Sequence, residues 1–365
     1  MSWFEGRVAD VAPKSRYGAG VCPLDENNRR VIVVGGRNIL NEFWGDAWVM
    51  DNNDKFSWTS LSIISKQAPP PHSFASVSTN NNKVYLFGGL KENGECEGDL
   101  WCGKVAGPSE ENPKTIEWDI IQIKKGQPTP RYGHTCNRVG SKLVFFGGSK
   151  SGEFFNDIYY FTPDTNTWSK PSCSGIAPEG RCYHTSTLIG NKLYIFGGLG
   201  KNKIYSDVFM FDLESDSWTK MMLPGTPKAR FGHTATALGN SIIMCGGRTL
   251  PSEPVMDTGD GGDLIDSFAS GIPVLDTESR GWVMPFGDSI QSEDVAHHSA
   301  FSFSTTKVIF IFGLKLVIKK SGRRLNPQLE VINKHRILYH LNTNLLQYSP
   351  DGSTSSRSHA KNPAK

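Results

Sequence analysis

The feature that most constrains this chain is a short apolar run that ends in two glycines and recurs along the sequence. Five copies, VIVVGG, VYLFGG, LVFFGG, LYIFGG and IIMCGG, end at Gly36, Gly89, Gly148, Gly198 and Gly247, and a degenerate sixth, VIFIFGL, carries Gly313. A period of about 50 residues, built on runs rich in β-branched and aromatic residues, is typical of propeller blades rather than of helical solenoids.

Each repeat contains the material for four strands. A first short strand precedes the apolar run, as in RYGHT from Arg131, and a third strand begins beside an aspartate such as Asp157. The fourth carries a tryptophan, at Trp58, Trp118, Trp168, Trp218 and Trp282. Because the apolar runs are continuous instead of alternating, we expect strands that are covered on both faces by neighbouring sheets. The sequence predicts an all-β, six-bladed propeller with four antiparallel strands per blade.

These residues resemble the kelch-repeat family, whose blades carry a strand-ending glycine pair followed by spaced aromatics that include tryptophan. The resemblance covers roughly residues 3–348 and implies a single propeller domain over 1–348. Its blades are expected near residues 16–60, 71–120, 130–170, 180–221, 229–285 and 296–348, with 1–8 closing the last and 349–365 forming a disordered tail. The sixth repeat departs from the family pattern, because Leu314 replaces the second glycine and a late tryptophan is missing.

Spacing predicts how the ring closes. Trp3 precedes Arg16 by the same number of residues that separates Trp118 from Arg131, so Trp3 reads as a fourth strand without a blade of its own. If it completes the sixth blade, the ends of the chain pair and no sheet edge is left open. The segment Leu345 to Tyr348 competes for the same position.

Four arginines occupy one repeat position at the start of the innermost strand: Arg16, Arg131, Arg181 and Arg230. Around a shared axis they would form a positive funnel for carboxylates or phosphates, because each guanidinium is a planar, two-pronged donor. In kelch proteins of similar pattern, arginines at this place contact acidic peptide ligands. The alternative is that each arginine pairs with a neighbouring loop or carboxylate and only braces its blade.

The loops after the glycine pairs should open on the same face. Arg37 and Arg248 begin the first and fifth of them, and Trp44 is a candidate exposed interface residue. The fifth loop is acidic, with Glu253, Asp257, Asp260, Asp263 and Asp266, and the sixth loop, in the adjacent repeat, is basic, with Lys319, Lys320, Arg323 and Arg324. These charges are consistent with mutual pairing, with a partner carrying both signs, or with two separately solvated loops. The basic cluster also has the composition of a nuclear-localisation patch.

Three histidines share a repeat position instead of forming a catalytic group. His134, His184 and His233 recur on the inner strand, so we expect each to make the same local hydrogen bond. The chain also lacks a GxSxG elbow, a Walker loop and an HExxH motif. Kelch-related iron-dependent specifier proteins use Glu, Asp and His spaced four apart, but here Ile290 precedes Asp294 and His298. We therefore expect no catalysis and no cofactor.

Net charge, apolar run length and cysteine pattern argue against several classes of partner and of site. The charge of +3 gives no bulk electrostatic case for nucleic acid, and no apolar run reaches the roughly 20 residues that span a bilayer. Seven cysteines without a CxxC pair argue against a disulfide framework and a four-cysteine zinc site. The N-terminus shows no secretory pattern, which predicts a cytoplasmic protein, or a nuclear one if the basic cluster directs import.

The sequence thus favours a monomeric, non-catalytic interaction module that holds an acidic peptide or protein over the loop face at the propeller axis. The alternative within the same class is a substrate receptor of a cullin-type ubiquitin ligase, although the chain lacks the BTB and BACK domains of many such adaptors. A copper oxidase or a metal-dependent propeller enzyme is the remaining, less favoured class.

Overall fold

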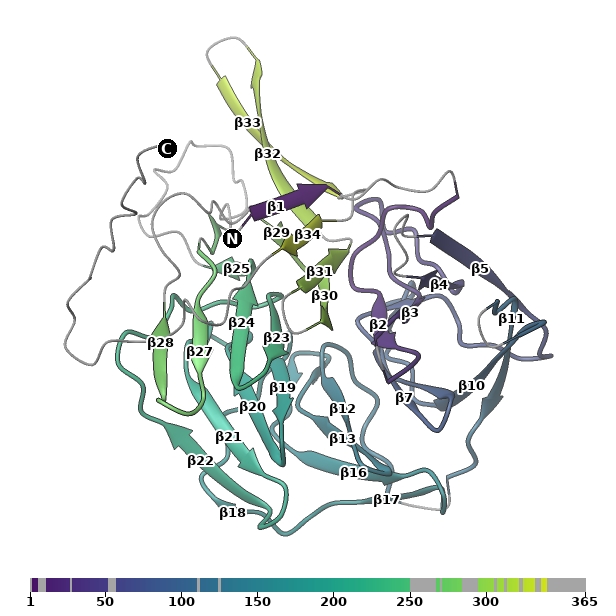
Figure 1. Cartoon of the computed structure of the whole chain (residues 1–365), viewed down its shortest axis with the longest axis horizontal. Coiled ribbons are helices and arrows are strands. Elements are labelled where there is room, and N and C mark those ends of the chain that lie inside the picture. The colour runs from purple at the N-terminus through teal and green to yellow at the C-terminus, as the bar shows by residue number, and fades with distance from the viewer. Residues whose placement is uncertain are drawn as a thin grey trace, which may run out of the picture.

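The computed structural model shows a chain of short strands arranged around a centre (Figure 1). It describes residues 2–5, 11–26, 28–51, 57–109, 112–123, 126–249, 267–269, 271–283, 295–304, 307–311, 314–321, 324–331 and 336–339. Every regular element in these ranges is a strand. No helix with the length and apolarity needed to cross a bilayer occurs among them.

The first two repeats form four-stranded antiparallel sheets. Their strands are β2 (Gly20–Pro23), β3 (Arg30–Val34), β4 (Ala47–Asp51) and β5 (Ser57–Ile63), then β7 (Ser76–Asn80), β8 (Lys83–Phe87), β10 (Leu100–Ala106) and β11 (Thr115–Ile120). The outer strands β5 and β11 pair in parallel, with Thr115 opposite Ser62, so the two sheets continue into each other.

The next three repeats follow the same order. Their strands are β12 (Thr135–Val139), β13 (Lys142–Phe146), β16 (Ile158–Thr162) and β17 (Thr167–Ser169); β19 (Thr185–Ile189), β20 (Lys192–Phe196), β21 (Val208–Asp212) and β22 (Ser217–Met221); and β23 (Thr234–Leu238), β24 (Ser241–Cys245), β27 (Val274–Asp276) and β28 (Gly281–Val283). A short β18 (Ser174–Gly175) adds to β22 in parallel. The five tryptophans expected on fourth strands lie on β5, β11, β17, β22 and β28.

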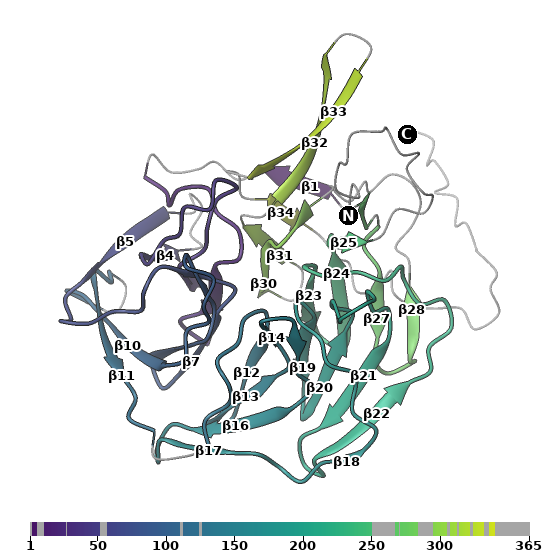
Figure 2. The same ribbon diagram turned by 180° about the vertical axis from the view of Figure 1, so that it is seen from behind.

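The last sheet joins the two ends of the described chain. It consists of β30 (Ser299–Ser304), β31 (Lys307–Ile311), β34 (Arg336–Tyr339) and β1 (Ser2–Glu5), with Trp3 opposite Leu338 in the antiparallel pairing of β1 and β34. β29 (Val295–Ala296), which precedes β30, forms a separate sheet with β32 (Leu314–Ser321) and β33 (Arg324–Val331), which lie between β31 and β34 in the chain; the long β32–β33 ribbon projects outward (Figures 1 and 2). The competing segment 345–348 and the expected tail 349–365 lie outside the described residues.

Short strands that follow the glycine pairs form two-stranded sheets. β14 (Ser149–Lys150) pairs with β15 (Glu153–Phe154), and β25 (Arg248–Thr249) pairs with β26 (Ser267–Phe268), whereas β9 (Leu90–Lys91) pairs with β6 (His72–Ser73), which precedes the first strand of its repeat. The first strands of the six sheets lie innermost, each contacts the next around the centre, and β30 contacts β2.

The core lies between neighbouring sheets. In one cluster, Phe146 of one sheet packs with Leu193, Phe211 and Trp218 of the next, and all four side chains are buried. The second strands are buried on both faces, as their continuous apolar runs predicted, because each sheet is covered by two neighbours. This stacking fixes the inner strands and their loops around the axis.

Candidate functional site

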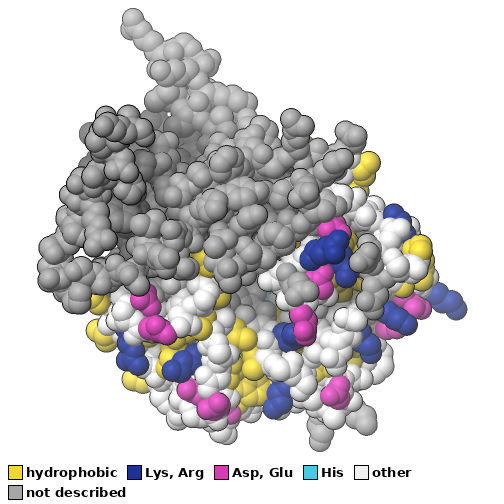
Figure 3. Space-filling view, viewed as in Figure 1, with side chains coloured by type: hydrophobic (Ala, Val, Ile, Leu, Met, Phe, Trp, Pro, Cys, Tyr) yellow, Lys and Arg dark blue, Asp and Glu magenta, His cyan; other side chains and the backbone are white. Residues whose placement is uncertain are grey.

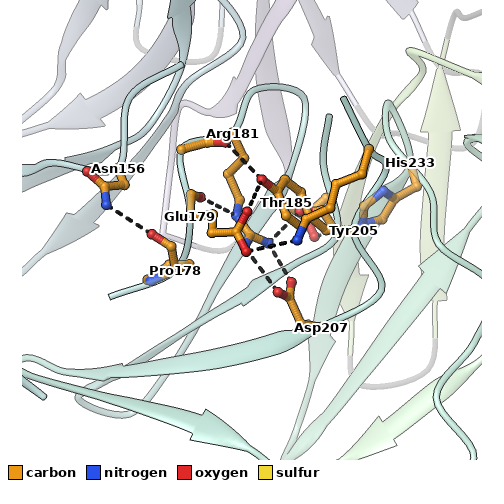
Figure 4. Close-up of polar contacts among 11 residues, drawn as sticks. Asn156, Pro178, Glu179, Arg181, Thr185, Tyr205, Asp207 and His233 are labelled. Carbon is orange, nitrogen blue, oxygen red and sulfur yellow. Dashed lines mark hydrogen bonds and ion pairs between the residues drawn. The ribbon is translucent and has the colours of Figure 1, made fainter. Parts of the chain in front are cut away.

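The four repeat-matched arginines are the first candidate site residues, and all four are buried, with 0 to 3% of each residue exposed. Each guanidinium donates to the carbonyl of the first glycine of its own pair and to a carbonyl two residues earlier in the chain. For Arg181 these acceptors are Gly197 O at 2.9 Å and Glu179 O at 3.0 Å (Figure 4). Arg16, Arg131 and Arg230 repeat the same two bonds.

Three of these arginines also hold a carboxylate and an aromatic ring. Arg181 forms a two-pronged ion pair with Asp207, and the ring of Tyr205 lies 4.0 Å from its guanidinium carbon. The same arrangement joins Arg16 to Asp46 and Trp44, and Arg131 to Asp157 and Phe155. Burial alone would raise the pKa of Asp46, but the hydrogen bonds and charge of Arg16 lower it overall.

The expected funnel of four exposed guanidiniums is therefore not formed. All four side chains connect the segment before the inner strand to the glycine pair, and Arg16, Arg131 and Arg181 also connect it to the third strand of the same blade. This is the bracing role that the sequence offered as the alternative. The cause is local. A planar guanidinium beside a carboxylate of the same blade makes its hydrogen bonds within that blade, so it does not face solvent.

Trp44 also has a different place from the one expected. Its half-buried ring lies 4.9 Å from the Arg16 guanidinium carbon, and it stands two residues before Asp46. Phe155 and Tyr205 stand in the same relation to their aspartates. Trp44 is thus a repeat position that caps a bracing arginine, and the spacing of an aromatic two residues before the aspartate was the signal for it.

The repeat-matched histidines make the same hydrogen bond in each repeat, as predicted, and these bonds form a belt between neighbouring blades, which was not predicted. Each Nε2 hydrogen-bonds a hydroxyl on the inner strand of the preceding sheet, at 2.7 Å for His134 and Ser76, 3.1 Å for His184 and Thr135, and 3.0 Å for His233 and Thr185. Burial lowers the pKa of His184 to about 3 and holds those of His134 and His233 well below the usual value. No histidine is visible on the described part of the face in Figure 3. Neutral, bonded imidazoles of this kind are structural.

An axial cluster of rings, which was not predicted from the sequence, closes the centre beside this belt. Two residues after the repeat arginine position, in the segment that leads into each inner strand, glycines alternate from repeat to repeat with large rings. The rings of Phe74, Tyr183 and His297 meet in a triangle with centroid separations of 4.9, 5.1 and 5.2 Å. All three have positive φ, between 52° and 60°.

The glycines make room for these rings. A Cβ added to Gly133 would lie 3.0 Å from the Tyr183 ring, and one on Gly18 or Gly232 would lie 2.7 Å from Phe74 or His297. Backbone N–H groups of these positions also bond from repeat to repeat, the last link running from Gly18 N to His297 O at 3.4 Å. The alternation of glycine and ring was the available sequence signal.

Arg37 and Arg248 lie over this cluster. Each pairs through its backbone with the residue that follows the repeat arginine, Arg37 with Tyr17 and Arg248 with Phe231. The Arg37 guanidinium carbon lies 5.2 to 5.4 Å from the rings of Tyr17 and Phe74, and that of Arg248 lies 5.7 Å from Phe231. We call the surface made by Arg37, Arg248, Tyr17, Phe74 and Phe231 the axial floor.

The axial floor is positive and partly open. Arg37 and Arg248 are half-buried, and burial lowers the pKa of Arg248. Burial lowers the pKa of His297 to about 3, and the charges of both arginines act in the same direction. Within the described ranges Arg37 makes no ion pair, and its side-chain hydrogen bond goes to the amide oxygen of Asn41 at 3.4 Å. The floor can therefore receive an anionic group.

The loop over residues 38–42 lies beside the axial floor and is held by side-chain hydrogen bonds. Asn38 Oδ1 accepts hydrogen bonds from the backbone N–H groups of Leu40 and Glu42, at 2.9 and 3.0 Å. This turn presents Ile39 and Leu40 to solvent with 48% and 75% of their surface exposed. Apolar side chains held out by a preorganised turn are suited to contact a partner.

Other expected features are not visible here. The acidic loop over 253–266 and Arg323 lie outside the described residues, and for Lys319, Lys320 and Arg324 only the backbone is described. Within the described part of the chain, no group of three or more His, Cys, Asp or Glu side chains is arranged to hold a metal ion.

Comparisons with known proteins agree with the geometry. A family model described as the KLHDC2/KLHL20/DRC7 kelch-repeats domain matches residues 109–313. The chain is 32% identical to human "Host cell factor 1" over 197 residues, which are 48% of this chain and 9% of that protein. It is 28% identical over 178 residues to the "F-box/kelch-repeat protein At1g51550" of Arabidopsis thaliana, covering 48% of this chain and 36% of that protein. These alignments span well under two thirds of either relative.

A solved structure shares the fold. The structure of YjhT superimposes with a TM-score of 0.62 at 17% identity, over 87% of this chain and 98% of YjhT. At this identity the similarity concerns the arrangement of the strands alone.

Proposed function

Because this chain belongs to the kelch-repeat family, whose propellers typically bind proteins, we propose that it is a non-catalytic module that binds an acidic peptide or protein over the axial floor. The observation that carries the proposal is the pair Arg37 and Arg248, held half-buried over a floor of aromatic rings. A guanidinium in such a place attracts a carboxylate more strongly than one in open solvent, because less water competes for it.

The proposal includes a closed ring of six blades. Six first strands contact one another in cyclic order, and the backbone bonds at the third positions run through all six repeats and return to Gly18. The antiparallel pairing of β1 with β34 places the N-terminal strand at the outer edge of the last sheet. A closed ring would hold loops from several blades in fixed positions and lower the ordering cost of binding.

The floor also has an apolar neighbour. Leu40 and Ile39 stand on the loop that begins at Arg37, so an acidic ligand could engage charge and apolar surface together. Protein interfaces combine an apolar core with a polar rim, and Arg is enriched in them.

The test is selection of a displayed peptide library on the immobilised full chain. We expect enrichment of peptides with Asp, Glu or a free carboxylate, and a loss of about 5- to 150-fold in affinity in Arg37→Glu or Arg248→Glu, corresponding to about 1–3 kcal/mol per charged hydrogen bond. Lys104→Glu is the matched control, because it makes the same charge change on an exposed position of β10. Enrichment of peptides without acidic groups, or equal losses in all three variants, would contradict the proposal.

A further inference from the structure

A cavity of about 1010 Å³, which we call the distal cavity, lies among the inner strands near the ends at which they stop. Residues of β2, β7, β12, β19 and β30 and of the turns after β2 and β7 line it, and the side chains of all of them are described. The axial floor lies before the starts of the same strands. The distal cavity therefore opens on the other face of the molecule, and it shares no residue with the floor.

Hydrogen bonds between neighbouring blades hold the walls of the distal cavity. Thr79 Oγ1 donates to Pro23 O at 2.7 Å, which joins the second blade to the first. Asn137 Nδ2 donates to Ser186 O at 3.2 Å, and Ser186 Oγ donates to Asn137 Oδ1, which joins the third blade to the fourth. A ligand meets amide and hydroxyl groups that are already in place, and this lowers the ordering cost of binding.

Three of the residues that line the distal cavity carry a charge at neutral pH, namely Asp25, Glu26 and Arg138. The carboxylate of Asp25 is used by its own turn. It accepts hydrogen bonds from the backbone N–H groups of Arg29 and Arg30, at 2.7 and 3.1 Å, and it forms an ion pair with the side chain of Arg30. The charges that remain for a ligand are those of Glu26 and Arg138, which have opposite signs.

Glu26 and Arg138 form an ion pair on the solvent side of the cavity. Arg138 Nη2 lies 3.7 Å from Glu26 Oε1, which is too long for a hydrogen bond. Glu26 follows β2 in the first blade and Arg138 lies on β12 in the third, so the pair passes the inner strand of the second blade. The two side chains are 87% and 43% exposed, and exposed pairs of this kind add little to stability. A ligand can therefore separate the two charges at small cost.

We propose that the distal cavity binds a small zwitterion, a free α-amino acid with an uncharged polar side chain. Its carboxylate binds Arg138, which offers a planar pair of donors, and its ammonium group binds Glu26. Glu26 repels a simple anion and Arg138 repels a simple cation, whereas a zwitterion satisfies both residues. The neutral walls favour an uncharged side chain, because a charged one would lose water without gaining a counter-charge. This site goes beyond the proposed function, since it lies away from the axial floor.

The test is isothermal titration calorimetry of the full chain with L-glutamine, L-asparagine, L-serine and L-threonine. We expect saturable binding of at least one of them. Its amide, which lacks the carboxylate, and its N-acetyl derivative, which lacks the ammonium group, should each bind about 10-fold more weakly or worse. Arg37→Glu should bind the amino acid like the parent chain, which separates this site from the axial floor. No saturable binding of any of the four, or equal affinity for an amino acid and both derivatives, would overturn the proposal.

Two variants assign each charge to its group on the ligand. Arg138→Met should remove the preference for the amino acid over its amide, because the carboxylate then has no partner. Glu26→Gln should remove the preference over the N-acetyl derivative and keep the preference over the amide.

Arg29→Met is the matched control for these variants. Arg29 Nε lies 3.7 Å from Asp51 Oδ1, an ion pair of the same length, but Arg29 does not line the cavity. The control should bind the amino acid like the parent chain, and all three variants should melt near the temperature of the parent because they change exposed side chains. Unchanged binding in both Arg138→Met and Glu26→Gln, or an equal loss in the control, would show that the proposal is wrong.

Discussion

Arg181 and Asp207 form a two-pronged ion pair, with Nη1 to Oδ1 at 2.6 Å and Nη2 to Oδ2 at 3.2 Å, and the arginine is fully buried. The pair connects the segment that leads into the inner strand β19 with the residue directly before the third strand β21 of the same blade. With the bonds to Glu179 O and Gly197 O, the guanidinium makes four hydrogen bonds to three residues (Figure 4). Arginines at this position therefore belong to the scaffold.

Replacing Arg181 with methionine should lower the free energy of unfolding by about 3–5 kcal/mol, because it leaves the partly buried carboxylate of Asp207 without its counter-charge. Urea denaturation followed by tryptophan fluorescence measures the change. The control is Lys203→Met, which breaks an exposed ion pair with Glu179 in the same blade and should cost less than about 1 kcal/mol. Equal losses in both variants would contradict the bracing role.

Gly133→Ala should destabilise the chain through the axial rings. Its Cβ would lie 3.0 Å from the Tyr183 ring, and overpacking of this kind costs about 1–3 kcal/mol, in addition to about 1 kcal/mol for the left-handed backbone at φ 64°. Gly140→Ala in the same repeat is the matched control, since φ is 57° but no atom lies within 4 Å. Thermal unfolding of both variants should separate the two costs, and identical melting temperatures would argue against a packed axis.

Stability should fall as the pH drops below about 6.5. The pKa of His184, His297 and His298 is lowered to about 3 by burial, whereas the unfolded chain takes up protons near 6.5. The unfolded state then binds more protons between these values, so each histidine removes about 1.4 kcal/mol of stability per pH unit through this window. Urea midpoints at pH 7, 6 and 5 measure the slope.

The variant His184→Gln checks the origin of that slope. It should be less stable at pH 7, because the bond to Thr135 is altered. The slope of its stability against pH should be smaller by the contribution of one histidine, about 1.4 kcal/mol per pH unit. A slope unchanged from that of the parent chain would place the proton uptake elsewhere.

Deleting residues 1–8 should lower the melting temperature of the whole chain. β1 pairs along its length with β34, and its loss would leave an open edge on the last sheet. Deleting residues 349–365, which the sequence predicts to be a tail, is the control and should leave melting unchanged. If the N-terminal deletion also melts normally, the outer position beside β34 does not depend on β1.

The local pattern of the sequence was sufficient for the all-β fold and the four-strand repeat. Continuous apolar runs before glycine pairs predicted the buried second strands, and the tryptophan spacing predicted the fourth strands. Periodicity also predicted that the histidines are structural, since a residue that recurs at one position of successive blades has the same neighbours each time. These properties depend on contacts within one repeat or between adjacent repeats.

The binding face could not be predicted in the same way. The sequence shows Arg181 and Arg37 as two charged residues at fixed positions of the repeat, but only the folded chain brings Asp207 to the first and aromatic rings to the second. Sequence by itself determined the repeating unit, because backbone pairing and burial are set locally. Tertiary structure decided which charges are neutralised, because that depends on side chains brought together from different strands and blades around the axis.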